Sequence, residues 1–207
     1  MVSGVGRFFG ALALIVLGAA PFAGVTEAAE PSPGYVAVGG STLVPYGWVD
    51  FCARYKGECD QAPVQALDVN ATASAMKRIK QINAWVNANV KPMSDKEHWG
   101  VIDRWDYPSD GYGDCEDYVL LKRRLLINEG YPRQGLLVTV VRDEKGDGHA
   151  VLTVKTNKGE YVLDNLDDEV RAWNKTRYRF VKRQSQTDPN QWVDLGDPTS
   201  APLVVSR

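Results

Sequence analysis

Histidine and cysteine are scarce in this chain, and cationic side chains are not in excess. Its 207 residues include two histidines and three cysteines, and the formal net charge is −2. Without a basic surplus the sequence lacks the electrostatic footprint of a nucleic-acid-binding protein or of a polybasic membrane patch. The two histidines and the single cysteine that is left unpaired (see below) also lack the ligand spacing of a zinc site. We therefore expect a soluble globular domain with no nucleic-acid partner. We also expect a monomer.

Long apolar runs are also rare, and the clearest one lies at the N-terminus. FFGALALIVLGAAPFAG follows Arg7, the only charged residue before it, and is too short and too interrupted by Gly and Pro for a good membrane span. Thr26 and Ala28 suit the −3 and −1 positions of a cleavage site. Residues 1–28 are therefore interpreted as a secretory signal peptide, with an uncleaved anchor as the alternative. An irregular lead-in over 29–47 and one domain over 48–207 would follow.

The three cysteines divide into a pair and a single residue. Cys52 and Cys59 lie seven positions apart, and an oxidising compartment would let them form a disulfide. Cys115 is then left over. An unpaired cysteine in an exported protein is either buried and inert or reactive, and this count does not decide between the two.

Periodicity predicts an α+β fold, with helices first and then an antiparallel sheet against which they pack. Apolar residues at spacings of three and four predict a helix of roughly 17 residues that ends before Pro92. A long ordered loop over 94–113 precedes a second, mostly buried helix, with Asp114 as its N-cap and Gly130 in its stop signal. Strands are predicted at 135–142, 149–155 and 160–165, with another near 178–182.

A nucleophilic triad can be assembled from these elements. Cys115 would begin the second helix, His149 the second strand, and Asp164 lies on the third. Cys, His and Asp in these places can carry out acyl transfer: the thiolate attacks a carbonyl carbon, the imidazole moves the proton, and the carboxylate orients the imidazole. Helix N-terminal amides would stabilise the oxyanion, with Trp105 or Tyr107 as a second donor. The alternatives are a structural histidine and a turn-capping aspartate.

The strand register can be tested from the sequence. If Asn157 and Lys158 form a two-residue hairpin turn, Thr156 faces Gly159 and Asp164 faces Val151. Side chains alternate along a strand, so His149 and Asp164 would then point to the same face as diagonal neighbours.

Three carboxylates surround Cys115: Asp114, Glu116 and Asp117. Acids at the start of a helix are ordinary, because they interact favourably with its dipole. Three beside a nucleophile are harder to explain, because like charge raises the pKa of a thiol. Clustered carboxylates are ligands suited to Ca²⁺, which would offset their charge and make activity calcium-dependent.

The blocks GYGDCEDY at 111–118, GHAVL at 148–152 and YVLDNL at 161–166 resemble the bacterial transglutaminase-like cysteine proteinases, from about Trp48 to Trp192. This resemblance implies a papain-like or transglutaminase-like core with Cys115, His149 and Asp164 as the triad. It implies calcium held by Asp114, Glu116 and Asp117. Because the family includes periplasmic proteases of the LapG type, it also suggests a large surface adhesin as substrate, a role in biofilm release and an inner-membrane regulatory receptor.

The sequence therefore predicts an exported, periplasmic cysteine endopeptidase that acts through a thioester. A transglutaminase-like acyltransferase or amidase would need the same triad. A catalytically silent periplasmic binding module with a structural Cys115 is the remaining alternative.

Overall fold

The computed structural model describes residues 1, 2, 4 and 33–195, so the predicted signal peptide lies almost wholly outside the described residues. The helices are α1 Tyr46–Arg54, α2 Lys56–Cys59, α3 Ala73–Asn89, α4 Asp95–His98 and α5 Cys115–Asn128, with 3-10 turns at Arg133–Gly135 and Trp173–Lys175. The strands are β1 Ser41–Thr42, β2 Lys91–Pro92, β3 Tyr112–Gly113, β4 Leu136–Arg142, β5 Gly148–Thr156, β6 Gly159–Leu163, β7 Arg171–Ala172, β8 Arg179–Gln184 and β9 Trp192–Asp194.

Seven strands form one antiparallel sheet in the order β1-β9-β8-β4-β5-β6-β7. The predicted meander is confirmed as β4, β5 and β6, which follow one another in the chain and in the sheet. The expectation of helices first and strands later is incomplete. β1 precedes every helix in the chain and pairs with β9, the last strand.

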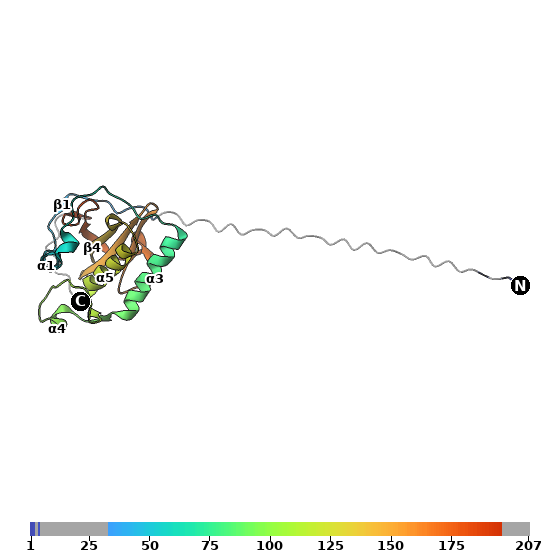
Figure 1. Ribbon diagram of the computed structural model, residues 1–207, viewed down its shortest axis with the longest axis horizontal. Helices are drawn as coiled ribbons and strands as arrows, with labels where there is room; N and C mark the ends of the chain where they lie inside the picture. Colours follow the sequence, from blue (N-terminus) through green and yellow to red (C-terminus); the bar gives the residue numbers. More distant parts are fainter. Residues whose placement is uncertain (3, 5–32, 196–207) are drawn as a thin grey trace. The chain divides into compact units, whose positions relative to one another are not determined.

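Two helices cover the sheet near Cys115, the first residue of α5. α5 packs on β5, and α3 packs on α5 (Figure 1). The 17-residue α3 matches its predicted length: the Thr72 side chain accepts a hydrogen bond from the Ala75 N–H at 3.1 Å, and Pro92 follows shortly after its end. α5 ends before Gly130, whose φ of +88° suits a residue without a Cβ.

Each face of the sheet has an apolar cluster. On the helical face, β4 and β5 contribute side chains such as Val138 and Leu152, which pack with Ile79 and Leu120. A smaller cluster that includes Val141, Val151 and Phe180 also contains Val36, from the segment before β1. Burial on both faces explains why these strands are more apolar than a half-exposed sheet requires. In the described part of the chain, no helix is long and apolar enough to span a bilayer.

The described residues of the predicted lead-in, 33–47, are not wholly irregular, since they contain β1 and the first residues of α1. The predicted loop over 94–113 likewise contains α4 and β3. A disulfide joins Cys52 in α1 to Cys59 in α2, as the cysteine count suggested, and Cys115 is a free, buried thiol.

Candidate active site

Cys115 is the first residue of α5, and its side chain is turned into the protein. The residue is 1% exposed, and its Sγ donates a hydrogen bond to Glu116 Oε2 at 2.9 Å. The Ala150 backbone N–H is directed at the sulfur, which places the thiol against β5 beside His149. Burial, then the charges of Glu116 and Asp114, raise the pKa of the thiol well above its usual value. Burial and the neighbouring acids therefore favour the protonated thiol.

His149 and Asp164 meet as the predicted register requires. Thr156 pairs with Gly159, and the ladder continues to the pair Leu152 and Leu163. One residue beyond that pair, Asp164 Oδ1 lies 2.9 Å from His149 Nε2. The other ring nitrogen, Nδ1, is buried and has no hydrogen-bond partner among the described residues.

Asp164 accepts hydrogen bonds from more than the histidine. Its Oδ1 also accepts from the Leu166 N–H at 3.0 Å, and its Oδ2 accepts from the Tyr178 hydroxyl. Burial raises the pKa of Asp164, but these hydrogen bonds and the charge of His149 bring it below the usual range, so the group is an anion. An anionic Asp164 fixes the proton of His149 on Nε2 and leaves Nδ1 able to accept one.

Tyr178 is a site residue that the sequence did not reveal. Its ring centre lies 5.4 Å from that of His149, and burial together with Asp164 raises its pKa, so it stays a hydroxyl donor. It immediately precedes β8, whose chain position gives no hint of an approach to β5 and β6. No local sequence signal marks it.

The three acids around Cys115 belong to a larger cluster, the acid cluster, which we define as Asp95, Asp103, Asp114, Glu116 and Asp117; Asp103 is half-buried and the other four are buried. Two groups within it have ligand atoms that all lie within 4.8 Å of one another: Asp95, Asp103 and Glu116, and Asp95, Asp114 and Asp117. The structure thus brings Asp95 and Asp103 to the three acids named from the sequence. Asp95 belongs to both groups, and it comes from α4, inside the segment predicted as a loop.

Asp114 takes the N-cap position of α5, but its side chain makes no capping hydrogen bond. Both of its carboxylate oxygens, and Glu116 Oε1, are buried without a hydrogen-bond partner among the described residues. Burial and the neighbouring Asp95 raise the pKa of Asp114 to about 8. Burial and Asp114 raise that of Asp117 to about 9. The predicted N-cap position of Asp114 is confirmed, but its side chain does not cap α5, because the carboxylate is held among other acids.

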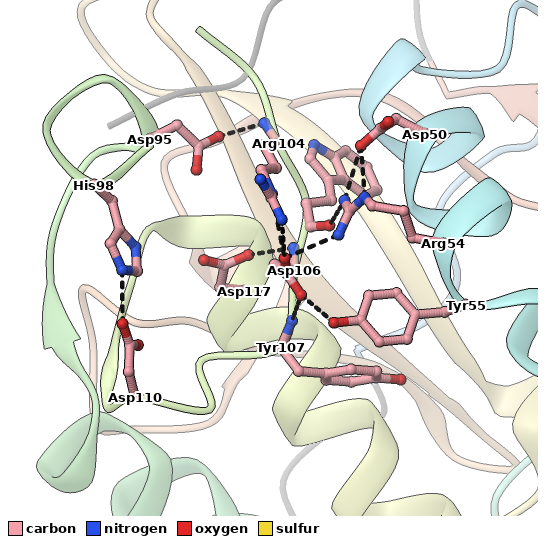
Figure 2. Close-up of polar contacts among 11 residues, drawn as sticks. Asp50, Arg54, Tyr55, Asp95, His98, Arg104, Asp106, Tyr107, Asp110 and Asp117 are labelled. Atoms are coloured by element: carbon pink, nitrogen blue, oxygen red, sulfur yellow. Dashed lines mark hydrogen bonds and ion pairs between the residues drawn. The ribbon is translucent and has the colours of Figure 1, made fainter. Parts of the chain in front are cut away.

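A hydrogen-bond network anchors this cluster to α1 (Figure 2). The Asp106 N–H donates to Asp117 Oδ1 at 2.7 Å, and the Arg104 N–H donates to Asp95. Arg54 in turn donates to Asp106 Oδ2 at 2.9 Å, and Tyr55 donates to its Oδ1. The segment 103–107 is therefore fixed from both sides and presents backbone amides to the acids.

Gly113 allows this arrangement on the other side of Asp117. A Cβ at position 113 would lie 2.6 Å from Asp117 Oδ2 and 2.7 Å from Asp117 Cβ. Any larger residue would displace the carboxylate, which explains a glycine directly before Asp114.

The indole and the amide suggested as second oxyanion donors both have partners in the structure. The Trp105 indole donates to Asp103 Oδ1 at 2.9 Å, and Trp105 is fully buried. The Tyr107 backbone N–H donates to Asp106 Oδ1 at 2.8 Å. His98 is also outside the triad, since its Nε2 lies 2.7 Å from Asp110 Oδ2 on the loop (Figure 2).

Together these residues make an arrangement that can perform nucleophilic chemistry. A thiol begins a helix, where backbone amides favour a developing negative charge. An imidazole oriented by an anionic carboxylate stands on the adjoining strand, with an accepting nitrogen unoccupied. The acid cluster brings carboxylate oxygens close enough together to hold a divalent cation.

Comparison with solved structures bears on the fold. The calcium-bound form of LapG from Legionella pneumophila is 20% identical over 60% of this chain and 73% of its own, with a TM-score of 0.50. Another structure of Legionella pneumophila LapG is 23% identical over 59% of this chain and 71% of its own, with a TM-score of 0.49. At these identities the likeness concerns the fold. No curated protein matches the chain.

A family model supplies the assignment. The model of the bacterial transglutaminase-like cysteine proteinases matches residues 38–200, which include all the helices and strands described above. With a thiol, an imidazole and a carboxylate on the elements that this chemistry needs, the chain belongs to the bacterial transglutaminase-like cysteine proteinases and is a cysteine protease.

Proposed function

We propose that the protein is an exported, periplasmic cysteine endopeptidase whose triad is Cys115, His149 and Asp164. The observation that carries this proposal is the 2.9 Å contact of His149 Nε2 with Asp164 Oδ1, which leaves Nδ1 free of other partners among the described residues. The thiol lies against the next residue of the same strand, Ala150.

The reaction follows from these contacts. His149 Nδ1 accepts the thiol proton, and the Cys115 thiolate attacks the carbonyl carbon of a peptide bond. The imidazolium, stabilised by Asp164, then protonates the leaving amine, and a thioester remains on Cys115. Water hydrolyses the thioester with His149 as the base. Cys115 and His149 are both 1% exposed, so a peptide reaches them only after neighbouring side chains move.

The acid cluster is proposed to hold Ca²⁺. The buried oxygens of Asp114 and Glu116 that lack donors fit such an ion, and carboxylate oxygens are the ligands Ca²⁺ prefers. Asp95, Asp103 and Asp117 complete the set. When bound, Ca²⁺ supplies positive charge that offsets these acids and stabilises the start of α5. The relative with a TM-score of 0.50 is described as calcium-bound, which supports this proposal.

Glu116 connects the cluster with the nucleophile. Its Oε2 accepts a hydrogen bond from Cys115 Sγ at 2.9 Å, and its carboxylate is also part of the acid cluster. Ligation through Oε2 would end that hydrogen bond. The thiol proton would then have His149 Nδ1 as its acceptor, so that the acid cluster controls whether the triad is assembled.

Export and substrate are part of the same proposal. The N-terminal apolar run supports export, and the Cys52–Cys59 disulfide is of the kind found in oxidising compartments. By resemblance to LapG-type proteases, we propose a large cell-surface adhesin as the substrate and an inner-membrane receptor as the regulator.

The test compares surface and periplasmic proteins from cells that carry the wild-type protein or Cys115→Ala. We expect new protein N-termini, found by mass spectrometry, only with the wild type and only when calcium is present. A fluorescent primary amine added to the same reaction separates the two outcomes of a thioester. Amine incorporated into protein without new N-termini would replace the endopeptidase with an acyltransferase.

A further inference from the structure

Asp164 lies just beyond the end of β6, where the sheet no longer fixes its backbone. The last ladder pair joins Leu152 to Leu163, and the residues that follow Asp164 form no regular element until β7. The direction of its carboxylate therefore depends on what holds the segment 164–168.

Two asparagines from α3 bind this segment. Asn87 Nδ2 donates to the Asp164 carbonyl oxygen at 2.9 Å and to Asp168 Oδ1 at 2.8 Å. Asn83 Nδ2 donates to the carbonyl oxygens of Asp167 and Asp168 at 3.1 Å and 3.0 Å. The two asparagines lie one helical turn apart, so they share a face of α3. Asn83 is fully buried.

A lysine from α5 faces the same segment. Lys122 is fully buried two turns after Cys115, and its Nζ has no hydrogen-bond partner among the described residues. Asp164 and Asp168 are the charges that act on it, and the Tyr118 ring centre lies 5.8 Å from its Nζ. Burial lowers its pKa to about 7, against the opposing effect of the two aspartates.

A buried lysine without a partner is costly, and an apolar residue of similar size generally stabilises such a position. The same holds for the carboxamide oxygens of Asn83 and Asn87, which are buried without partners among the described residues. Simple packing does not require these polar groups. All three side chains interact with the segment 164–168, which carries Asp164.

We propose that Asn83, Asn87 and Lys122 are positioning residues that hold the segment 164–168 so that Asp164 faces His149. The inference rests on the proposed triad. The hydrogen bonds of β6 end at Leu163, so side chains from α3 and α5 would hold the segment that follows. These residues act through Asp164 and touch neither the substrate nor the sulfur.

The first experiment measures how fast iodoacetamide alkylates Cys115, the one free thiol, in calcium-saturated protein at pH 7. Asn87→Leu removes the amide donors and is expected to slow alkylation about tenfold, part of what an oriented base contributes. Asn89→Leu is the matched control, because Asn89 is on the same helix and, among the described residues, its amide donates only to Trp85 O. It should remain within about twofold of the wild type.

A double-mutant cycle with Asp164→Ala separates positioning from general damage. If Asn87 acts through Asp164, adding Asn87→Leu to Asp164→Ala slows alkylation no further. Equal slowing in both backgrounds, or an Asn87→Leu rate like that of Asn89→Leu, overturns the inference. If Asp164→Ala alone keeps the wild-type rate, the proposed triad fails, and this inference fails with it. Asn87→Ala serves in the same cycle if Asn87→Leu does not fold.

Lys122→Met adds an independent readout. It should slow alkylation about threefold while leaving thermal stability equal to or above that of the wild type, because it removes an unpaired buried amine. Arg123→Met is the matched control: Arg123 is buried on the same helix, but its Nε donates to Leu136 O at 2.9 Å. This control should lose stability and keep its alkylation rate. A Lys122→Met variant that loses stability and keeps its rate contradicts the proposal.

Discussion

The electrostatics of the proposed site depend on single residues that bridge its parts, and Tyr178 is one of them. Its hydroxyl donates to the oxygen of Asp164 that His149 does not use, and its ring lies beside the imidazole. The hydrogen bond helps to keep the Asp164 carboxylate ionised, and the ring packs against His149.

Tyr178→Phe keeps the ring and removes the hydroxyl. We expect kcat/KM to fall about tenfold, which corresponds to the loss of one hydrogen bond to a charged group. Tyr35→Phe is the control, since it also removes a phenolic donor, here from Thr156 O, but far from the triad in the chain. Unchanged kcat/KM in Tyr178→Phe, measured on any peptide that the wild type cleaves, would show that the hydroxyl has no part in orienting Asp164.

Glu116 is the second bridging residue, because it accepts a hydrogen bond from the Cys115 thiol and belongs to the acid cluster. Burial, then the Glu116 charge, raise the pKa of Cys115. Burial and Asp114 raise the pKa of Glu116 itself well above its usual value, so its charge develops only at alkaline pH. At that pH Glu116→Gln removes the charge, so the thiol should ionise more readily, and Cys115 should be alkylated faster than in the wild type when calcium is chelated. Glu129→Gln, at the other end of the same helix, should leave the rate of Cys115 alkylation unchanged. Slower alkylation of Glu116→Gln contradicts this account of the thiol.

At the scale of elements, much could be predicted from local pattern. α3 and α5 follow from apolar spacing and clear stop residues, and the β5–β6 register follows from the Asn157–Lys158 turn, which brings His149 to Asp164. Asp95 and Tyr178 could not be predicted, because they reach the site from a short helix inside a loop and from the start of another strand. Their proximity exists only after the chain has folded.

The acid cluster gives stability a pH dependence that calcium should reverse. Folding raises the pKa of Asp114 and Asp117 from 3.8 to about 8 and about 9. Between these values the unfolded chain loses the protons and the folded chain keeps them, so stability falls as pH rises from about 4 to 9. The midpoint of thermal unfolding in a chelator should therefore decrease from pH 5 to pH 9.

Calcium favours the ionised carboxylates, so the rise in this midpoint on adding calcium should be larger at pH 9 than at pH 5. Asp114→Asn with Asp117→Asn should flatten both trends. A calcium effect that is absent, or is the same at every pH, would contradict the assignment of these two residues as ligands.

At the scale of the whole molecule, hydrogen bonds from Arg54 and Tyr55 connect the region of the disulfide with the acid cluster. The disulfide joins α1 to α2. Arg54 and Tyr55 bind Asp106, whose N–H donates to Asp117.

The Cys52–Cys59 disulfide closes a short loop and so constrains the unfolded chain. Cys52→Ser with Cys59→Ser should therefore lower the free energy of unfolding by about 2 kcal/mol. Urea unfolding of the oxidised protein and of the double variant measures this directly, and equal midpoints would show that the link contributes nothing.

The central claim, that Cys115 is a nucleophile activated by His149, is tested most directly by the pH dependence of Cys115 alkylation in calcium-saturated protein. His149→Ala and His98→Ala remove the two histidines of the chain one at a time. We predict that His149→Ala slows alkylation at neutral pH by at least about tenfold, while His98→Ala keeps the wild-type profile. Slow alkylation of the wild type that His149→Ala leaves unchanged would contradict the account.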